Sequence, residues 1–178
     1  MRTLIKFGFA GIVALIGGGF ALYTYFQTQA NVVFIDNTHP VPVTVAVAGQ
    51  THELQPGQEA VVELDEGEHE VVATGPEGEL TRGSVTVTGS SFRGIYDLAG
   101  TGHYMVVHAT FNAAGGGTQY EELPPGSGFH QLPAGTVREG LDETIPTEMT
   151  SSSSSGSTTL IYACRFNPES ETIGCPGA

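Results

Sequence analysis

Apolar and polar positions alternate regularly along residues 41–48. Val41, Val43, Val45 and Val47 fall on one side of an extended chain, and smaller or polar residues occupy the positions between them. A period of two residues is typical of a β-strand that buries one of its faces. We therefore predict a half-buried strand here, near the start of an all-β domain.

Further short apolar segments recur along the chain, with turn-forming residues between them. The segments are residues 31–36, 51–54, 59–64, 68–74, 79–82, 84–88, 92–98 and 103–111. In the last of these, Met105, Val107, Ala109 and Phe111 share one face. A series of short strands separated by turn signals predicts a small antiparallel β-sandwich, which we assign to residues 31–112.

The N-terminus contains an apolar run without a charge at residues 7–26. A helix of this length rises about 30 Å, which matches the hydrocarbon thickness of a membrane. Arg2 and Lys6 precede the run, so the positive-inside rule places the remainder of the chain outside the cytoplasm. We predict a single-pass transmembrane anchor over residues 1–30. The alternative is a signal peptide that is cleaved near Ala30 and releases a secreted domain.

The composition changes after residue 112. Residues 113–157 are rich in Gly, Pro and Ser, so we predict a loop region there. Residues 158–178 begin with a strand-like segment and contain the two cysteines of the chain, Cys164 and Cys175. In an exported protein such a pair favours a disulfide, which would close a small C-terminal loop.

Acidic residues dominate the chain beyond the apolar run. Four arginines face nineteen aspartates and glutamates there, which gives a formal charge of −15, and no lysine is present. A field of this sign repels nucleic acid and anionic lipid head groups. We therefore exclude nucleic acid as a partner, and we expect the membrane to be contacted through the N-terminal helix.

Carboxylates are concentrated at Asp65, Glu66 and Glu68, beside Gly67 in a predicted hairpin turn. Carboxylate oxygens suit calcium, so these three residues are the candidate metal ligands. The run lacks the ligand spacing of an EF-hand loop, which favours a solvated acidic turn instead. The sequence contains no G-x-S-x-G nucleophile motif and no strand–glycine loop–helix arrangement for phosphates. We therefore predict a protein that is not an enzyme and has no cofactor.

The sequence LDEGEHEVVA at residues 64–73 follows a strand and a Pro56-Gly57 turn. This order of features resembles PEGA-type and carboxypeptidase-regulatory-like modules, which are small β-sandwich domains of surface-exposed bacterial and archaeal proteins. The resemblance covers residues 31–88 and implies an immunoglobulin-like sandwich without catalytic residues. The aromatic residue that commonly follows the later glycine in these modules is missing here.

Together these features predict a non-catalytic, membrane-anchored module that acts in the periplasm or at the cell surface. Its expected partner is another envelope protein or the cell wall, contacted by strand addition at an exposed sheet edge. The alternative function is that of an exported domain that binds calcium or a carbohydrate through the acidic turn and neighbouring loops.

Overall fold

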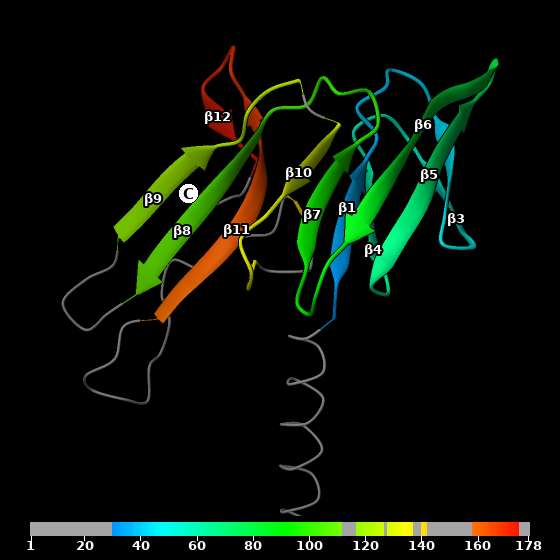
Figure 1. The fold of residues 1–178 in the computed structure, drawn as a ribbon. Helices are drawn as coiled ribbons and strands as arrows, with labels where there is room; N and C mark the ends of the chain where they lie inside the picture. Colours follow the sequence, from blue (N-terminus) through cyan, green and yellow to red (C-terminus); the bar gives the residue numbers. More distant parts are fainter. Residues whose placement is uncertain (1–29, 112–116, 127, 137–139, 142–157, 175–178) are drawn as a thin grey trace, which may run out of the picture. The chain divides into compact units, whose positions relative to one another are not determined.

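The computed structural model describes residues 30–111, 117–126, 128–136, 140–141 and 158–174, and this part of the chain is all-β (Figure 1). Its twelve strands form three four-stranded sheets. Sheet A has the order β10 (Phe129–Gln131), β7 (Arg93–Asp97), β1 (Val32–Asp36), β4 (Glu59–Glu63). Sheet B has the order β3 (Gln50–Leu54), β2 (Val43–Val47), β5 (Gly67–Gly75), β6 (Gly78–Val87). Sheet C has the order β12 (Thr172–Ile173), β11 (Thr158–Asn167), β8 (Tyr104–Phe111), β9 (Gly117–Glu122).

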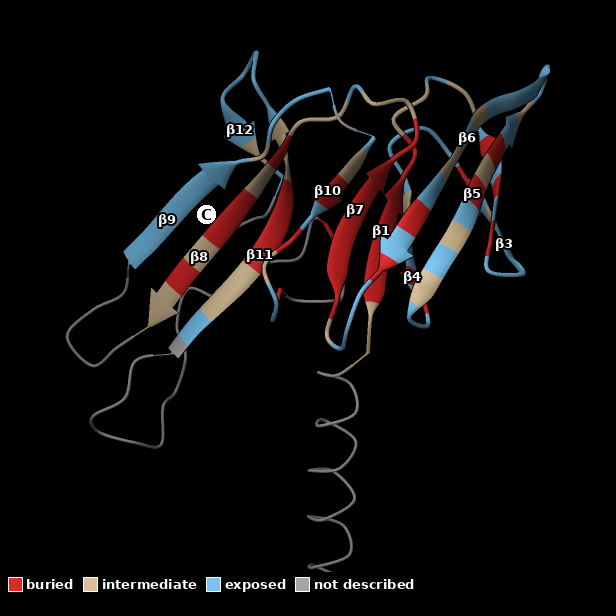
Figure 2. Cartoon of the chain, in the orientation of Figure 1, coloured by how far each residue is buried: buried red, intermediate tan, exposed pale blue. Residues whose placement is uncertain are grey.

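Sheet A is the middle layer of the three. Val33 and Ile35 of β1 belong to an apolar cluster shared with sheet B, whereas Val32 and Phe34 belong to a cluster shared with sheet C. Successive side chains of a strand point to opposite faces, so both faces of sheet A are covered. Figure 2 shows β1 and β7 buried from end to end. A strand covered on both faces requires a continuous apolar sequence, which Val-Val-Phe-Ile provides.

Two apolar cores hold the layers together. The core between sheets A and B contains the buried residues Val33, Ile35, Val43, Val45, Val47, Leu54, Ala60, Val62, Leu64, Val71, Ala73, Val85, Val87, Phe92, Tyr96 and Leu98. The core between sheets A and C contains the buried residues Val32, Phe34, Ile95, Tyr104, Val106, Leu132, Leu141 and Ala163.

The strand that the alternation predicts at residues 41–48 is present as β2, with its valines buried and the residues between them exposed. A hairpin connects β2 to β3 through Ala48 and Gly49, whose φ angles of 48° and 75° are both positive. Positive φ angles at both central residues are typical of a type I′ turn, whose twist matches that of the flanking strands. The predicted all-β fold is confirmed for the described residues.

One pairing differs from the antiparallel arrangement that the sequence predicts. β1 and β7 run parallel, with Val32 opposite Arg93 and Asp36 opposite Asp97. The chain forms β5 and β6 in sheet B between β4 and β7, and it re-enters sheet A in the direction of β1. Hydrophobic alternation specifies which face of a strand is buried, but it does not specify the direction of the neighbouring strand.

The hairpin predicted at residues 65–67 is also absent, and this prediction is wrong. β4 pairs with β1 in sheet A, whereas β5 pairs with β2 and β6 in sheet B. Residues 65–67 therefore carry the chain from one sheet to the other. Gly67 has a φ of 138°, which fits the positive φ expected there. Turn chemistry looks alike in a hairpin and in a crossing between sheets, so the sequence could not distinguish them.

Sheet C carries apolar side chains on both faces. Tyr104 and Val106 of β8 face sheet A, while Val107 and Ala109 belong to a third apolar cluster on the opposite face. This is the alternation predicted for residues 103–111. β11 pairs antiparallel with β8 and contains the strand expected after the serine tract.

The segment predicted as a loop region, residues 113–157, contributes strands β9 and β10 to sheets C and A. The predicted anchor lies outside the described residues, apart from Ala30. Within the described part of the chain, no helix has the length and apolar character needed to cross a membrane.

Candidate functional site

A cluster of charged and polar groups lies between sheets A and C, and we call Asp36, Glu59, Tyr104 and Arg165 the polar clamp. Arg165 binds the Asp36 carboxylate through two nitrogens, with Nη2–Oδ1 at 2.9 Å and Nε–Oδ2 at 3.1 Å. The Tyr104 hydroxyl donates to Asp36 Oδ2 at 2.8 Å. Arg165 Nη2 also reaches Glu59 Oε2 at 3.2 Å. Asp36 and Glu59 come from sheet A, and Tyr104 and Arg165 come from sheet C, so the clamp joins the two sheets.

Burial sets the chemistry of the polar clamp. The Asp36 side chain is 1% exposed, and its two oxygens accept three hydrogen bonds from Arg165 and Tyr104. Burial raises the pKa of Tyr104, and the neighbouring Asp36 charge raises it further. A buried carboxylate is tolerated when a bidentate arginine and a hydroxyl satisfy its lone pairs. We assign the clamp a structural role, because its acceptors are used within the protein.

A second buried carboxylate organises the loop that leads into sheet C. Asp97 ends β7 and is 1% exposed. Its oxygens accept backbone N–H bonds from Ala99 at 3.2 Å, Gly100 at 3.0 Å and Gly102 at 2.6 Å, together with a bond from the Thr38 hydroxyl. These bonds hold residues 99–102 against the end of β7, so Asp97 fixes the entry into β8.

The candidate metal ligands do not come together as a site. Asp65 and Glu66 are exposed in the crossing between sheets A and B, while Glu68 lies on β5. His69 contacts this segment through its Nε2, which lies 2.7 Å from the backbone oxygen of Asp65. In the part of the chain that the structure describes, no three His, Cys, Asp or Glu side chains form a group suited to a metal ion.

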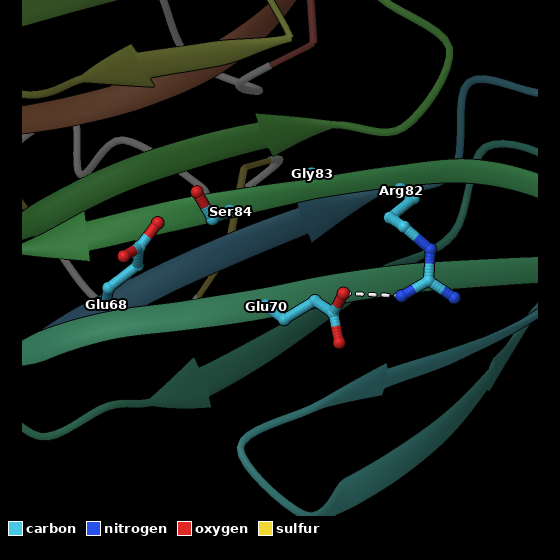
Figure 3. Close-up of a pocket in the computed structure, with 5 residues that line it drawn as sticks. All are labelled: Glu68, Glu70, Arg82, Gly83 and Ser84. Carbon is cyan, nitrogen blue, oxygen red and sulfur yellow. Dashed lines mark hydrogen bonds and ion pairs between the residues drawn. The ribbon is translucent and has the colours of Figure 1, made fainter.

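A shallow surface depression of about 460 Å³ lies on the outer face of sheet B (Figure 3). It is lined by Glu68, Glu70, Arg82, Gly83 and Ser84. Arg82 forms an ion pair with Glu70 at its rim, and Figure 3 shows the Arg82 and Glu70 side chains directed toward one another. Glu68, one of the candidate metal ligands, lines this depression, whereas Asp65 and Glu66 do not.

Arg82 is bound on both sides by carboxylates. Its Nη2 lies 2.6 Å from Glu79 Oε2 and its Nε lies 2.9 Å from Glu79 Oε1, in addition to the Glu70 contact. The hydrogen bond from Arg82 lowers the pKa of Glu79, and the hydrogen bonds to Glu79 and Glu70 raise the pKa of Arg82. The depression therefore offers an incoming ligand no uncompensated positive charge among its described residues.

Strand β9 is the most exposed strand that the structure describes, and all six of its residues are exposed. It forms one edge of sheet C and pairs only with β8 among the described strands. The N–H of Leu123 donates to the Tyr104 oxygen at 2.9 Å, which makes Tyr104 and Leu123 a hydrogen-bonded pair. Such pairs alternate along antiparallel strands, so Gln119 and Glu121 also bond to β8.

The same alternation defines which backbone groups of β9 are available. Thr118, Tyr120 and Glu122 occupy the non-hydrogen-bonded positions opposite β8, so their N–H and C=O groups point away from the sheet. Figure 2 shows β9 exposed along its length. The sequence predicts a loop region at this segment, whereas the structure forms a strand there. The only signal that could have identified the strand is the short run Thr-Gln-Tyr-Glu-Glu after three glycines.

The predicted disulfide involves one residue within the structure and one outside it. Cys164 is buried on the outer face of sheet C. Cys175 lies outside the described residues, so the pairing stays a prediction.

Comparisons of this chain with family models, with curated proteins and with solved structures give no match.

Proposed function

We propose that the chain is a non-catalytic, membrane-anchored module that holds its β domain outside the cytoplasm and binds another envelope component through β9. The observation that carries this proposal is the edge of sheet C, where six consecutive exposed residues present outward backbone groups at Thr118, Tyr120 and Glu122. An extended segment of a partner can add to such an edge by main-chain hydrogen bonds.

β9 has few of the features that usually protect a sheet edge from unwanted pairing. Edge strands are normally shortened, interrupted by proline or covered, since an open edge promotes unwanted pairing. β12 has two residues and β10 has three, which limits pairing at those edges. β9 contains neither proline nor lysine. β3, β4 and β6 also lie at sheet edges, and β9 differs from them because every one of its six residues is exposed, which favours a role in binding.

The proposed location rests on the uncharged run at residues 7–26, and the proposed fold type rests on residues 31–88. Residues 31–88 contribute strands to two packed sheets, with β1 and β4 in sheet A and β2, β3, β5 and β6 in sheet B. This arrangement supports a PEGA-like, immunoglobulin-like sandwich, to which sheet C is added as a third layer. Modules of that type are non-catalytic, in keeping with the proposed role.

Site-specific photo-crosslinking in membranes tests the proposal. A photoreactive amino acid replaces Tyr120 on β9 in the full-length chain, and the matched control carries it at Thr51, an exposed position on β3. We expect a discrete protein adduct from position 120 only. The same adduct should disappear when Thr118→Pro removes an outward N–H, and it should persist with Thr118→Ala, which keeps that N–H. Equal labelling from both positions would contradict the proposal.

A further inference from the structure

The described surface has very little free positive charge. Arg93 is buried, with its Nε donating to the Thr136 oxygen at 3.1 Å. Arg165 belongs to the polar clamp, and Arg82 is paired with Glu70 and Glu79. The acidic residues of β9, Glu121 and Glu122, therefore act within a strongly negative field. A cationic partner is attracted by this field, whereas a second copy of the same acidic chain is repelled.

The two faces of β9 differ in their surroundings. Tyr120 is directly opposite Val107, so its side chain points to the outer face of sheet C, where it is 48% exposed. That face continues into an apolar cluster formed by Met105, Val107, Ala109, Phe111, Leu160, Tyr162, Cys164 and Ile173. Thr118 and Glu122 share the face of Tyr120, whereas Gln119 and Glu121 point to the opposite face, because successive side chains alternate.

We propose that β9 accepts an extended segment of a partner protein in which apolar residues alternate with lysine or arginine. This inference rests on the function proposed above, and it specifies the chemistry of the partner. In an added strand, every second side chain lies beside Tyr120 on the apolar face, and the others lie beside Gln119 and Glu121. Apolar residues suit the first set of positions, and cationic residues suit the second.

Three short peptides with blocked termini test this proposal with the full-length chain in nanodiscs of zwitterionic lipid. The first alternates valine and lysine, the second alternates valine and glutamate, and the third has the composition of the first in two blocks. We expect the first peptide to bind roughly tenfold more tightly than the other two by fluorescence anisotropy. Its affinity should fall as salt concentration rises.

Variants of β9 separate this inference from the proposed function. Glu121→Gln should weaken the valine–lysine peptide several-fold, and Thr118→Pro should abolish its binding while Thr118→Ala leaves it unchanged. If all three peptides bind equally and Thr118→Pro abolishes binding, the strand-addition function stands and the cationic, alternating partner is wrong. If Glu121→Gln weakens binding and Thr118→Pro does not, binding is electrostatic and the proposed use of the β9 edge fails. If no peptide binds, the inference is overturned.

Discussion

Sheets B and C both pack against sheet A, but the two interfaces are built differently. Among the described residues, sixteen apolar residues are buried in the core between sheets A and B, whereas the core between sheets A and C has eight and is accompanied by the polar clamp. Apolar burial is non-directional and scales with area, while a buried ion pair requires one geometry. The comparison indicates that the A–B core supplies most of the stability and that the clamp fixes how sheet C docks.

Breaking the polar clamp should give the largest effect. Arg165→Met keeps much of the side-chain volume and removes the charge, which leaves the buried Asp36 carboxylate without its ionic partner. We expect the free energy of unfolding to fall by about 3–5 kcal/mol, as measured by urea denaturation. Replacing both partners, with Asp36→Leu and Arg165→Met together, should lose less than the single change.

The matched control is Arg82→Met, which removes an ion pair on the outer face of sheet B. The side chains of Arg82 and Glu70 are 51% and 63% exposed, and exposed pairs contribute little because solvent screens them. Arg82→Met should therefore leave the denaturation midpoint almost unchanged. Equal losses for the two arginine variants would show that the clamp has no special role at the A–C interface.

The pairing of β11 with the edge strand β12 in sheet C provides the second prediction. Phe166 lies opposite Ile173, and the Gly174 N–H donates to the Arg165 oxygen at 2.6 Å. In the sequence Cys164 precedes Arg165 and Cys175 follows Gly174, and in antiparallel strands the pair next to a hydrogen-bonded pair is a non-hydrogen-bonded pair. The Cα atoms of such a pair are about 4.5 Å apart, which is within the range for a disulfide. We therefore expect a Cys164–Cys175 bond across the two strands.

Cys175→Ser tests this bond without altering the buried Cys164. Loss of a disulfide that closes a short loop should lower the free energy of unfolding by roughly 2–3 kcal/mol under oxidising conditions. Reductant should have the same effect on the natural chain and no further effect on the variant. Intact mass should rise by two hydrogens on reduction, and an unchanged mass would refute the bond.

The sequence predicts structural features that depend on neighbouring residues, such as the buried face of a strand. It does not predict contacts between residues that are far apart in the chain. The alternation in β2 identifies its buried face because one face of that strand packs on a core, and the alternation in β8 identifies which residues share a face. The Asp36–Arg165 pair joins residues 129 positions apart, and no local pattern links them. The metal candidates are the opposite case, since Asp65, Glu66 and Glu68 are close in sequence, but they do not form a group suited to a metal ion among the described residues.

A close approach in the A–B interface gives the third prediction. A Cβ atom at Gly83 of β6 would lie 2.1 Å from the hydroxyl oxygen of Tyr96, which projects from sheet A. Gly83→Ala should therefore force the two sheets apart locally and lower the free energy of unfolding by about 1–3 kcal/mol. The double variant Gly83→Ala with Tyr96→Phe removes the clashing oxygen and should recover part of the loss. If the double variant is no more stable than Gly83→Ala alone, the Tyr96 hydroxyl is not the source of the clash.

The fourth prediction compares the two interfaces through the loss of stability at alkaline pH. The pKa of Tyr104, in the polar clamp, is raised by burial and by Asp36, and the pKa of Tyr96, in the A–B core, is raised by burial alone. The unfolded chain releases these phenolic protons near pH 10, while the folded protein retains them to higher pH. The unfolded state therefore binds fewer protons above pH 10, and stability falls as pH rises there.

Each retained proton should lower the free energy of unfolding by about 1.4 kcal/mol per pH unit above pH 10. Tyr104→Phe should cost about 1 kcal/mol at neutral pH through its lost hydrogen bond, and it should flatten the decline between pH 10 and pH 11. The matched comparison is Tyr96→Phe in the A–B core, because the pKa of Tyr96 is raised by burial alone. Lys6 is the one lysine in the chain, so the groups that titrate in this range are mainly its six tyrosines. An unaltered slope in Tyr104→Phe would contradict this expectation, because it would show that Tyr104 does not retain its proton in the folded protein above pH 10.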